Sequence, residues 1–551
     1  MINTFSVKSR WQAQQELRGR QVDVLIIGGG ITGAGIALDC QSRGLETVLV
    51  EMQDFASGAS GRSTKLIHGG LRYLRKGEFK LVKEVGRERE IVYENGPHIT
   101  MPERVVLPII KGGAYGKYLT ALGLTLYDQL AQEKKKERFR WLSKTELSEQ
   151  EPLLRVERVV GAGQYMEYRT DDARLTIEVI KKAIRFGAKA FNYMRVEEFL
   201  YEQKRIVGVK VRDLLINKVF YWYARKVVNA TGPWIDKLRK KEGMKQDKRV
   251  VLTKGVHLVV AHDKLPLRQP VYLPHVDGRM IFAVPRQGKT YIGTTDTVYH
   301  GDLSHPRVTR DDRDYLIHAI NEVFSPVHLR SEDIETCWAG VRSLILKKGK
   351  AISDISRKDE LFLSSSGLIS VTGGKLTGYR KIAQRVTDLV AKEIQQETKR
   401  RFRSCFTQYI CVSGGEVGGA DRFAAFVKSK VELGKNLGMS EWEAEELVRR
   451  YGSNVDAVFD WVKKQPFQDK WGLPPNLYAS LMYGLEQEMV VTPTDFFMRR
   501  IGAMYFEIDL VKKWKEPVTA LMSQYLKWNN EQTQKAMKLL EKEIRIATEV
   551  I

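Results

Sequence analysis

A glycine-rich turn between a buried strand and a helix constrains the fold of this chain more than any other feature. Residues 22–27 are almost continuously apolar and predict a buried strand, and Gly28, Gly30 and Gly33 follow it directly. A helical pattern comes next, and residues 47–50 predict a second strand. This order of strand, glycine turn, helix and strand is typical of the first unit of a doubly wound α/β fold.

The spacing of the glycines matches what a bound dinucleotide requires. Gly28 permits a tight turn, Gly30 lets the backbone approach a pyrophosphate, and Gly33 allows close packing of helix on strand. The helix start offers amide donors and a partial positive charge to phosphates. Glu51 ends the second strand, where a carboxylate can accept hydrogen bonds from ribose hydroxyls and would repel a 2′-phosphate. The turn therefore predicts FAD or NAD and disfavours NADP.

Composition narrows the class of protein and its partners. The chain has 551 residues, of which 43% are hydrophobic and 28% charged, a globular composition with room for roughly two to four domains. The net charge of +23 indicates an anionic partner, which is nucleic acid, an acidic membrane surface or a phosphorylated substrate. The four cysteines form no CxxC pair, so we expect neither a disulfide framework nor a metal site. Their small number fits a cytoplasmic protein best.

No window of the sequence reaches the roughly 18 consecutive apolar residues of a membrane-spanning helix.

Several motifs carry a specific resemblance to a known family. They are KLIHGGLRYL at 65–74, KGVH at 254–257, YIGTTD at 291–296, WAGVR at 338–342 and TGGKLT at 372–377. Together they resemble the FAD-dependent glycerol-3-phosphate dehydrogenases over nearly the whole chain. The resemblance implies an α/β FAD-binding Rossmann-like domain with an interleaved α+β substrate-binding domain, followed by a mainly α-helical C-terminal domain.

A change of pattern near residue 410 sets the expected domain boundary. The glycine-rich loop 413–419 resembles a linker, and the pattern beyond it is mostly helical. The expected bounds are 20–410 for the catalytic region, with FAD parts at about 20–75, 160–240 and 350–400 and substrate parts at about 76–159 and 241–349, and 411–551 for the helical domain.

The resemblance also implies how FAD is held, without a covalent bond. Val196 would contact the adenine end through its backbone, Asp296 would lie near the ribityl or phosphate portion, and residues 374–377 would approach the isoalloxazine. Ala59 and Gly61 stand where the family more often has hydroxyl residues, so fewer side-chain donors face the pyrophosphate. The expected cofactor site comprises Gly28, Gly29, Gly30, Thr32, Gly33, Glu51, Met52, Ser60, Ser63, Thr64, Leu66, Val196, Ala230, Thr231, Gly232, Asp296, Gly374, Leu376 and Thr377.

The implied reaction is oxidation of sn-glycerol 3-phosphate to dihydroxyacetone phosphate by hydride transfer to the flavin, with electrons passed to a membrane quinone. Arg72 and Lys375 are the expected phosphate ligands, since a guanidinium matches phosphate oxygens bidentately. His68 and His257 are both candidate acceptors of the C2 hydroxyl proton, and the sequence leaves this choice open. Arg342 would stabilise negative charge that develops on the substrate oxygen or the flavin.

Other functions fit parts of the same pattern. A glycerol-3-phosphate oxidase would use oxygen as the acceptor, although such oxidases commonly carry an extra insertion. An amine or amino-acid oxidase shares the flavin fold but has no use for phosphate ligands. A flavin-containing protein acting on RNA would use the basic charge, but the basic residues are spread out and no nucleic-acid motif is present, so we expect no nucleic-acid partner.

A quinone acceptor implies contact with the inner face of the cell membrane. Anionic headgroups attract a basic surface by roughly 1 kcal/mol per nearby Lys or Arg, so we expect weak, peripheral association. The basic stretches 239–249 and 399–403 are the expected contact points. The resemblance also leaves room for a homodimer.

The substrate assignment is tested by Arg72→Ala. Loss of a charge-assisted contact to a desolvated phosphate costs a few kcal/mol, so the KM for glycerol 3-phosphate should rise far more than that for unphosphorylated glycerol. Steady-state kinetics with both substrates measure this, and equal losses would mean that Arg72 does not hold the phosphate.

Overall fold

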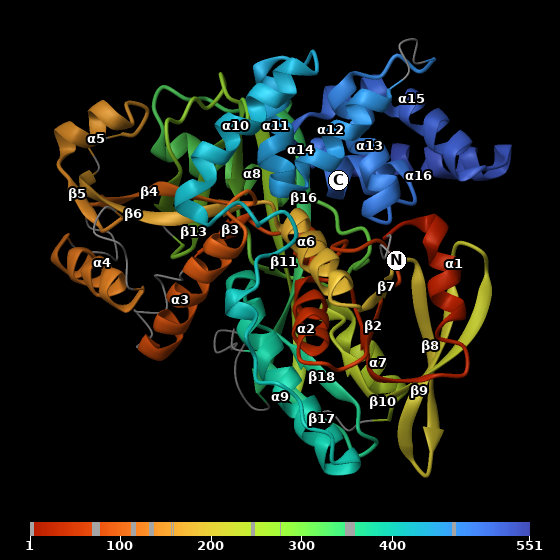
Figure 1. The fold of residues 1–551 in the computed structure, drawn as a ribbon. Coiled ribbons are helices and arrows are strands. Elements are labelled where there is room, and N and C mark those ends of the chain that lie inside the picture. The colour runs from red at the N-terminus through yellow and green to blue at the C-terminus, as the bar shows by residue number, and fades with distance from the viewer. Residues whose placement is uncertain are drawn as a thin grey trace.

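Two mixed sheets and a layer of helices form the protein, as a computed structural model shows (Figure 1). The structure describes residues 5–68, 78–111, 117–131, 137–155, 157, 159–243, 248–275, 277–347, 359–465 and 470–551. In these ranges, no helix is long and apolar enough to span a membrane.

The first sheet has eight strands and grows from the glycine-turn unit. Its path runs β17-β18-β10-β1-β2-β7, and β9 pairs with β10 and β8 with β9 off this path. β1 pairs in parallel with β2 on one side and with β10 on the other. The strands are β1 (Gln21–Ile27), β2 (Thr47–Val50), β7 (Lys189–Phe191), β8 (Met194–Glu202), β9 (Arg205–Asp213), β10 (Lys218–Asn229), β17 (Glu360–Leu363) and β18 (Ile369–Thr372).

The second sheet has ten strands and follows the path β15-β11-β14-β13-β12-β4-β6-β3, with β16 on β11 and β5 on β6. Its long antiparallel pairs, β11 with β16 and β4 with β6, form its two halves. The strands are β3 (Leu66–Ile67), β4 (Thr100–Ile110), β5 (Arg140–Leu142), β6 (Val159–Thr170), β11 (Lys248–Ala261), β12 (Val271–Pro274), β13 (Met280–Arg286), β14 (Lys289–Gly293), β15 (Thr297–Val298) and β16 (Ile334–Lys347).

Helices cover both sheets. α2 contacts α6 and α9, and the three share a hydrophobic core with β1 and β18. The helices before residue 400 are α1 (Val7–Gln15), α2 (Ile31–Ser42), α3 (Phe79–Asn95), α4 (Lys117–Ala131), α5 (Lys144–Gln150), α6 (Asp172–Arg185), α7 (Ile235–Lys241), α8 (Arg310–Val323) and α9 (Tyr379–Thr398).

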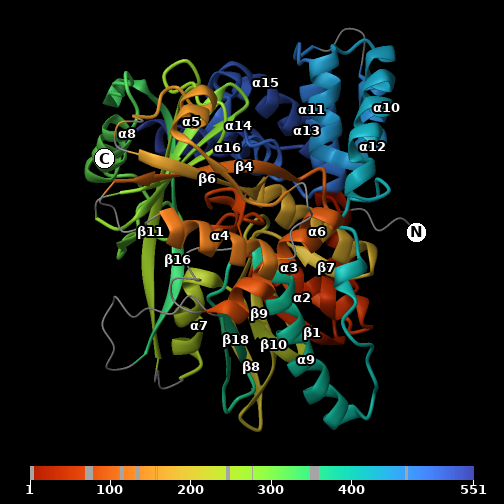
Figure 2. The ribbon, with the colours of Figure 1, turned by 90° about the vertical axis from the view of Figure 1, so that its left-hand side faces the viewer.

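The C-terminal part is helical, as the sequence predicts. Helices α10 to α13 stand together at one end of the molecule, above α6 (Figure 2). The helices are α10 (Phe423–Asn436), α11 (Glu441–Tyr451), α12 (Val455–Lys464), α13 (Pro475–Gln487), a π-helical turn at Asp495–Arg500, α14 (Ala503–Phe506), α15 (Ile508–Leu526) and α16 (Asn530–Thr548).

This helical part shares a core with the second sheet. Trp338 of β16 contacts Tyr505 and Phe506 of α14, with ring centroids 5.0 and 5.9 Å apart. All three side chains are buried, and burial of an aromatic side chain contributes roughly 1.5–3 kcal/mol. The C-terminal helices are therefore an integral layer of the fold, packed against the sheet that borders the candidate site.

Candidate functional site

A cavity of about 1090 Å³ lies where the two sheets meet. The first sheet supplies the turn after β1 and the segments after β10 and β18. The second sheet supplies Tyr272 and Phe282, whose rings stack 4.1 Å apart, and residues 340–344 of β16. The loop between β2 and β3 closes the wall between them.

Most of the expected cofactor residues line this cavity. They are Gly28, Gly30, Thr32, Glu51, Met52, Ser60, Ser63, Thr64, Leu66, Val196, Ala230, Thr231, Gly232, Asp296, Gly374, Leu376 and Thr377. Gly29 and Gly33 lie behind the lining and shape the turn itself. Residues far apart in sequence are thus brought to one site, although their individual roles stay predictions.

The glycine turn is built so closely that side chains are excluded from it. A Cβ on Gly28 would lie 2.5 Å from the carbonyl oxygen of Ala230, and Gly28 has φ +117°. A Cβ on Gly33 would lie 1.9 Å from the carbonyl oxygen of Gly28, and one on Gly30 would lie 2.9 Å from Ser60 Oγ. The turn therefore leaves backbone, not side chains, facing the cavity, which fits the approach of a pyrophosphate.

The N-terminus of α2 faces the cavity through Ile31 and Thr32. Its N-cap residue, Gly30, has no side chain to satisfy the first amides. Ser60 takes part of this role, because its hydroxyl accepts a hydrogen bond from the backbone N–H of Ile31 at 2.9 Å. The Ser60 hydroxyl keeps its own proton, so it can still donate to a phosphate oxygen in the cavity.

Glu51 is fixed by the backbone around it. Its carboxylate accepts hydrogen bonds from the N–H groups of Gly29 and Gln53, both at 2.8 Å. Burial raises the pKa of Glu51, and these two amide donors offset part of that rise. The side chain is thereby oriented at the end of β2, where it lines the cavity and can accept from ribose hydroxyls.

Three of the expected catalytic residues, His68, Arg342 and Lys375, line the same cavity. The backbone oxygen of His68 accepts a hydrogen bond from Thr377 Oγ1 at 3.2 Å, which joins two of the sequence motifs directly. Arg342 Nη2 donates to Thr294 Oγ1 at 3.5 Å. Arg72, the other expected phosphate ligand, lies outside the described residues.

His257 lies one layer behind the cavity lining. Its ring stacks on Trp338 with centroids 4.7 Å apart, and its Nε2 is 3.0 Å from Thr64 Oγ1. Burial, and then the charges of Arg342 and Lys65, hold the pKa of His257 well below its usual value. The imidazole is therefore neutral at neutral pH and touches the cavity through Thr64, which does line it.

The ion pair between Lys65 and Asp172, buried behind Ser63 and Thr64, was not predicted from the sequence. Lys65 Nζ donates to Asp172 Oδ1 at 2.6 Å, and the other oxygen of Asp172 accepts from the N–H of Ser63 at 2.8 Å. Lys65 has φ +56°, a left-handed conformation unusual for a non-glycine residue. The pair fixes this wall of the cavity, but a separation of 107 residues hides it from any local motif.

Two family models match this chain. The family model of FAD dependent oxidoreductases matches residues 23–380, which contain both sheets and the cavity. A second model, the C-terminal domain of alpha-glycerophosphate oxidase, matches residues 405–533. Fold and site thus define a FAD dependent oxidoreductase with an additional helical domain.

Several glycerol-3-phosphate dehydrogenases are similar to this chain over almost its whole length. The aerobic glycerol-3-phosphate dehydrogenase of Bacillus subtilis (strain 168) is 50% identical over 98% of both chains, and that of Staphylococcus aureus (strain USA300) is 49% identical over 99% of this chain and 98% of its own. The X-ray structure of the Bacillus halodurans glycerol-3-phosphate dehydrogenase complexed with FAD is 46% identical over 99% of both chains, with a TM-score of 0.86. The L-alpha-glycerophosphate oxidase of Mycoplasma pneumoniae, 18% identical with a TM-score of 0.54 over 70% of this chain and 96% of its own, shares the fold.

The chain therefore belongs to the FAD-dependent glycerol-3-phosphate dehydrogenases. The resemblance, the fold class and the FAD cofactor predicted from the sequence are confirmed.

The close contact at Gly33 generates a test of the cofactor site. Gly33→Ala would place a methyl group against the backbone at Gly28, so the turn must open and FAD binding should fall steeply. The ratio of flavin to protein absorbance in the purified variant measures this. Gly123→Ala is the control, because a Cβ there meets nothing within 4 Å, and it should retain full flavin content. A fully loaded Gly33→Ala protein would show that the turn is not part of the FAD site.

Proposed function

We propose that this protein oxidises sn-glycerol 3-phosphate to dihydroxyacetone phosphate and passes the electrons to a quinone in the membrane. The observation that carries the proposal is the meeting of His68, Arg342 and Lys375 with the glycine turn in one cavity. The names of relatives at 46–50% identity over almost the whole chain support the same substrate.

The cationic side chain of Lys375, which lines this cavity, suits it to a phosphorylated alcohol, because it provides a point charge for the phosphate dianion. Arg72, which lies outside the described residues, is the bidentate partner that the sequence predicts. Arg342, held near Thr294, stabilises negative charge as the C2 hydroxyl loses its proton. FAD, when bound, supplies the hydride acceptor.

We assign the proton acceptor to His68. It lines the cavity, whereas His257 lies behind the lining, with its Nε2 next to the hydroxyl of Thr64. A base must come within hydrogen-bond reach of the proton that it removes. His257, kept neutral by burial and by neighbouring cations, instead orients Thr64.

Oxygen is the alternative electron acceptor, and the helical domain supplies the reason to test it. Residues 405–533 match a domain that takes its name from alpha-glycerophosphate oxidase. Simultaneous assays of peroxide formation and quinone reduction during turnover distinguish the two. Formation of one peroxide for each substrate consumed would contradict the quinone proposal and identify the protein as an oxidase.

The role of Arg342 is tested by the reductive half-reaction. Because its partner charge develops only in the transition state, Arg342→Ala should slow the bleaching of flavin absorbance by glycerol 3-phosphate far more than it weakens substrate binding. Rapid mixing over a range of substrate concentrations separates the two effects. Arg342→Lys keeps the charge and should recover part of the rate of flavin reduction. If Arg342→Ala weakens only the binding of glycerol 3-phosphate, Arg342 binds the phosphate instead.

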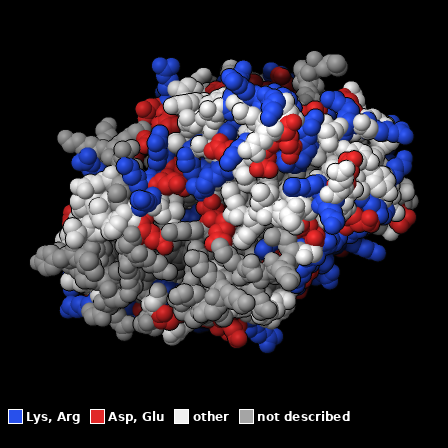
Figure 3. All heavy atoms as spheres, turned by 90° about the horizontal axis from the view of Figure 1, so that it is seen from below, with Lys and Arg blue, Asp and Glu red and all other residues white. Residues whose placement is uncertain are grey.

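The surface charge is mixed, which bears on membrane contact. On the lower face, Lys and Arg side chains are interspersed with Asp and Glu (Figure 3). Within the stretch 239–249, Arg239 is buried and donates to Asp236 at 2.9 Å, so it does not contribute to the surface patch expected from the sequence. Lys240 and Lys241 of that stretch are exposed. In the stretch 399–403, Lys399, Arg401 and Arg403 are exposed around a hollow beside α9.

Vesicle binding tests the membrane part of the proposal. We expect the protein to cosediment with vesicles containing anionic lipid at low salt and to dissociate at high salt. Replacing Lys399, Arg401 and Arg403 by Gln should weaken this binding. Replacing the exposed Lys535, Lys538 and Lys542 of α16 by Gln removes the same charge elsewhere and should not. Binding that ignores lipid charge and salt would contradict the electrostatic mechanism.

A further inference from the structure

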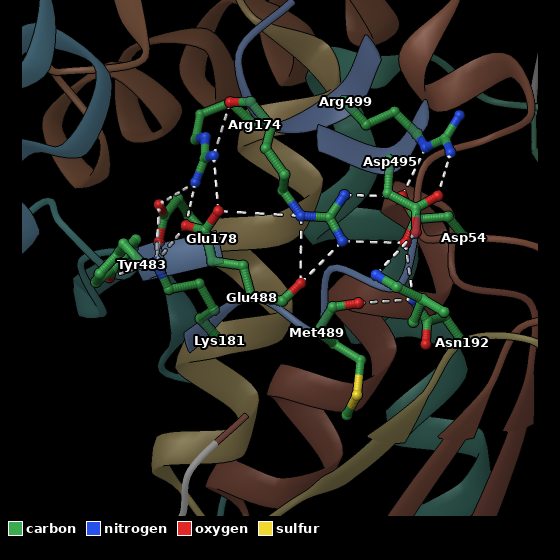
Figure 4. A network of polar contacts seen from close by, with 12 residues as sticks. Asp54, Arg174, Glu178, Lys181, Asn192, Tyr483, Glu488, Met489, Asp495 and Arg499 are labelled. Atoms are coloured by element: carbon green, nitrogen blue, oxygen red, sulfur yellow. Dashed lines mark hydrogen bonds and ion pairs between the residues drawn. The ribbon is translucent and has the colours of Figure 1, made fainter. Parts of the chain in front are cut away.

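A buried polar network joins the FAD-binding sheet to the C-terminal helices (Figure 4). On one side lie Asp54, from the loop after β2, and the charged face of α6. On the other side lie Glu488 and the π-helical turn that carries Arg499 and Arg500. The members are Asp54, Arg174, Glu178, Lys181, Asn192, Tyr483, Glu488, Asp495, Arg499 and Arg500.

Asp54 is the point where this network meets the cofactor loop. One oxygen of its carboxylate accepts from Arg499 Nε at 2.6 Å and Arg500 Nη1 at 2.7 Å. The other oxygen accepts from Arg500 Nη2 at 3.0 Å and Asn192 Nδ2 at 2.9 Å. Arg500 thus grips Asp54 bidentately, the geometry in which an Arg–carboxylate pair is strongest and most directional.

The two arginines are themselves held in place. Arg500 Nη2 also donates to the backbone oxygen of Glu488 at 2.8 Å, and Arg499 Nη2 donates to Asp495 Oδ1 at 2.7 Å. Burial would raise the pKa of Asp54, but the charges of Arg500 and Arg499 outweigh burial and hold it well below the usual range. Asp54 is therefore ionised, and both of its carboxylate oxygens have two hydrogen-bond donors.

The residues beside Asp54 form the outer side of the glycine turn. The N–H of Ala56 donates to the backbone oxygen of Gly29 at 3.0 Å, and a Cβ on Gly29 would lie 2.7 Å from the ring of Phe55. Ala56 has φ +59°, so this loop adopts a left-handed conformation that must be imposed by its contacts. Ser57 then lines the cavity.

We propose that Arg499 and Arg500 are positioning residues of the cofactor site, which act through Asp54 to hold the loop 51–57 against the glycine turn and so set the affinity for FAD. The helical C-terminal part thereby contributes to cofactor retention from behind the cavity. This inference rests on the FAD cofactor and is independent of the substrate and the electron acceptor.

Lys181 provides a matched control for a purely structural role. It is buried like Arg500 and belongs to the same network. Its Nζ donates to Glu178, Glu488 and Tyr483 at 3.1, 3.0 and 2.9 Å. Lys181 therefore ties α6 to the C-terminal helices without touching Asp54 in the described contacts.

The experiment compares FAD affinity with stability in the full chain. Arg500→Met and Lys181→Met are each titrated with FAD after removal of the flavin, with quenching of flavin fluorescence as the signal, and the urea midpoint of each holoenzyme is measured. We expect Arg500→Met to raise the FAD Kd by about tenfold or more, and Lys181→Met to leave it within about twofold at a similar loss of stability.

Arg500→Lys decides the matter if Arg500→Met does not fold. It keeps the charge but not the bidentate contact, so an FAD Kd above that of the unsubstituted protein, with a nearly unchanged urea midpoint, supports the proposal. An unchanged Kd in Arg500→Lys overturns it, whether or not Arg500→Met folds. The proposal is also overturned if the FAD Kd rises in proportion to the loss of stability, to the same degree in the Arg500 and Lys181 variants.

Discussion

Backbone contact at the glycine turn is the constraint on which the rest of the site depends. Gly28 closes against the carbonyl oxygen of Ala230, so the ends of β1 and β10 meet with no side chain between them. The helix amides after β1 and the segment after β10 therefore open into one cavity. Every other wall, from the loop after β2 to the turn after β18, is placed relative to this pair of strand ends.

Buried ion pairs hold several of the charged side chains that the sequence alone would place at the surface. Lys65 pairs with Asp172, Arg500 with Asp54, and Arg89 Nη1 donates to Glu167 at 3.1 Å, with every partner buried. An unpaired buried charge costs several kcal/mol, so these partners must be matched in number and geometry. The net charge of +23 therefore resides on other residues, and its distribution follows from the fold.

The local parts of the fold were predictable from the sequence, and the long-range polar contacts were not. The strand expected at 22–27 is β1, Gln21–Ile27, and the second strand was placed correctly at 47–50. Hydrophobic periodicity and glycine spacing act over a few residues, so they can be seen locally. The motif residues of the site came from a family resemblance, and the structure brings most of them to one cavity.

The contacts that escaped prediction share a physical reason. Asp172 and Asp54 look like ordinary surface acids in the sequence, and Arg239 looks like part of a basic patch. Asp172 and Asp54 are buried beside partners from distant parts of the chain, Lys65 and Arg500, and the burial of a charged side chain cannot be read from its neighbours in sequence. For the same reason the position of His257 behind Thr64 required the register of β11 against β14 and β16.

The contact between Asp54 and Arg500 spans 446 residues of sequence. On the ribosome, the strands around the glycine turn emerge long before the helical turn that secures the loop beside it. Asp54 therefore cannot gain its arginine partner until the chain has been made as far as Arg500. The support of the loop after β2 is thus among the last contacts of the FAD-binding part that synthesis makes possible.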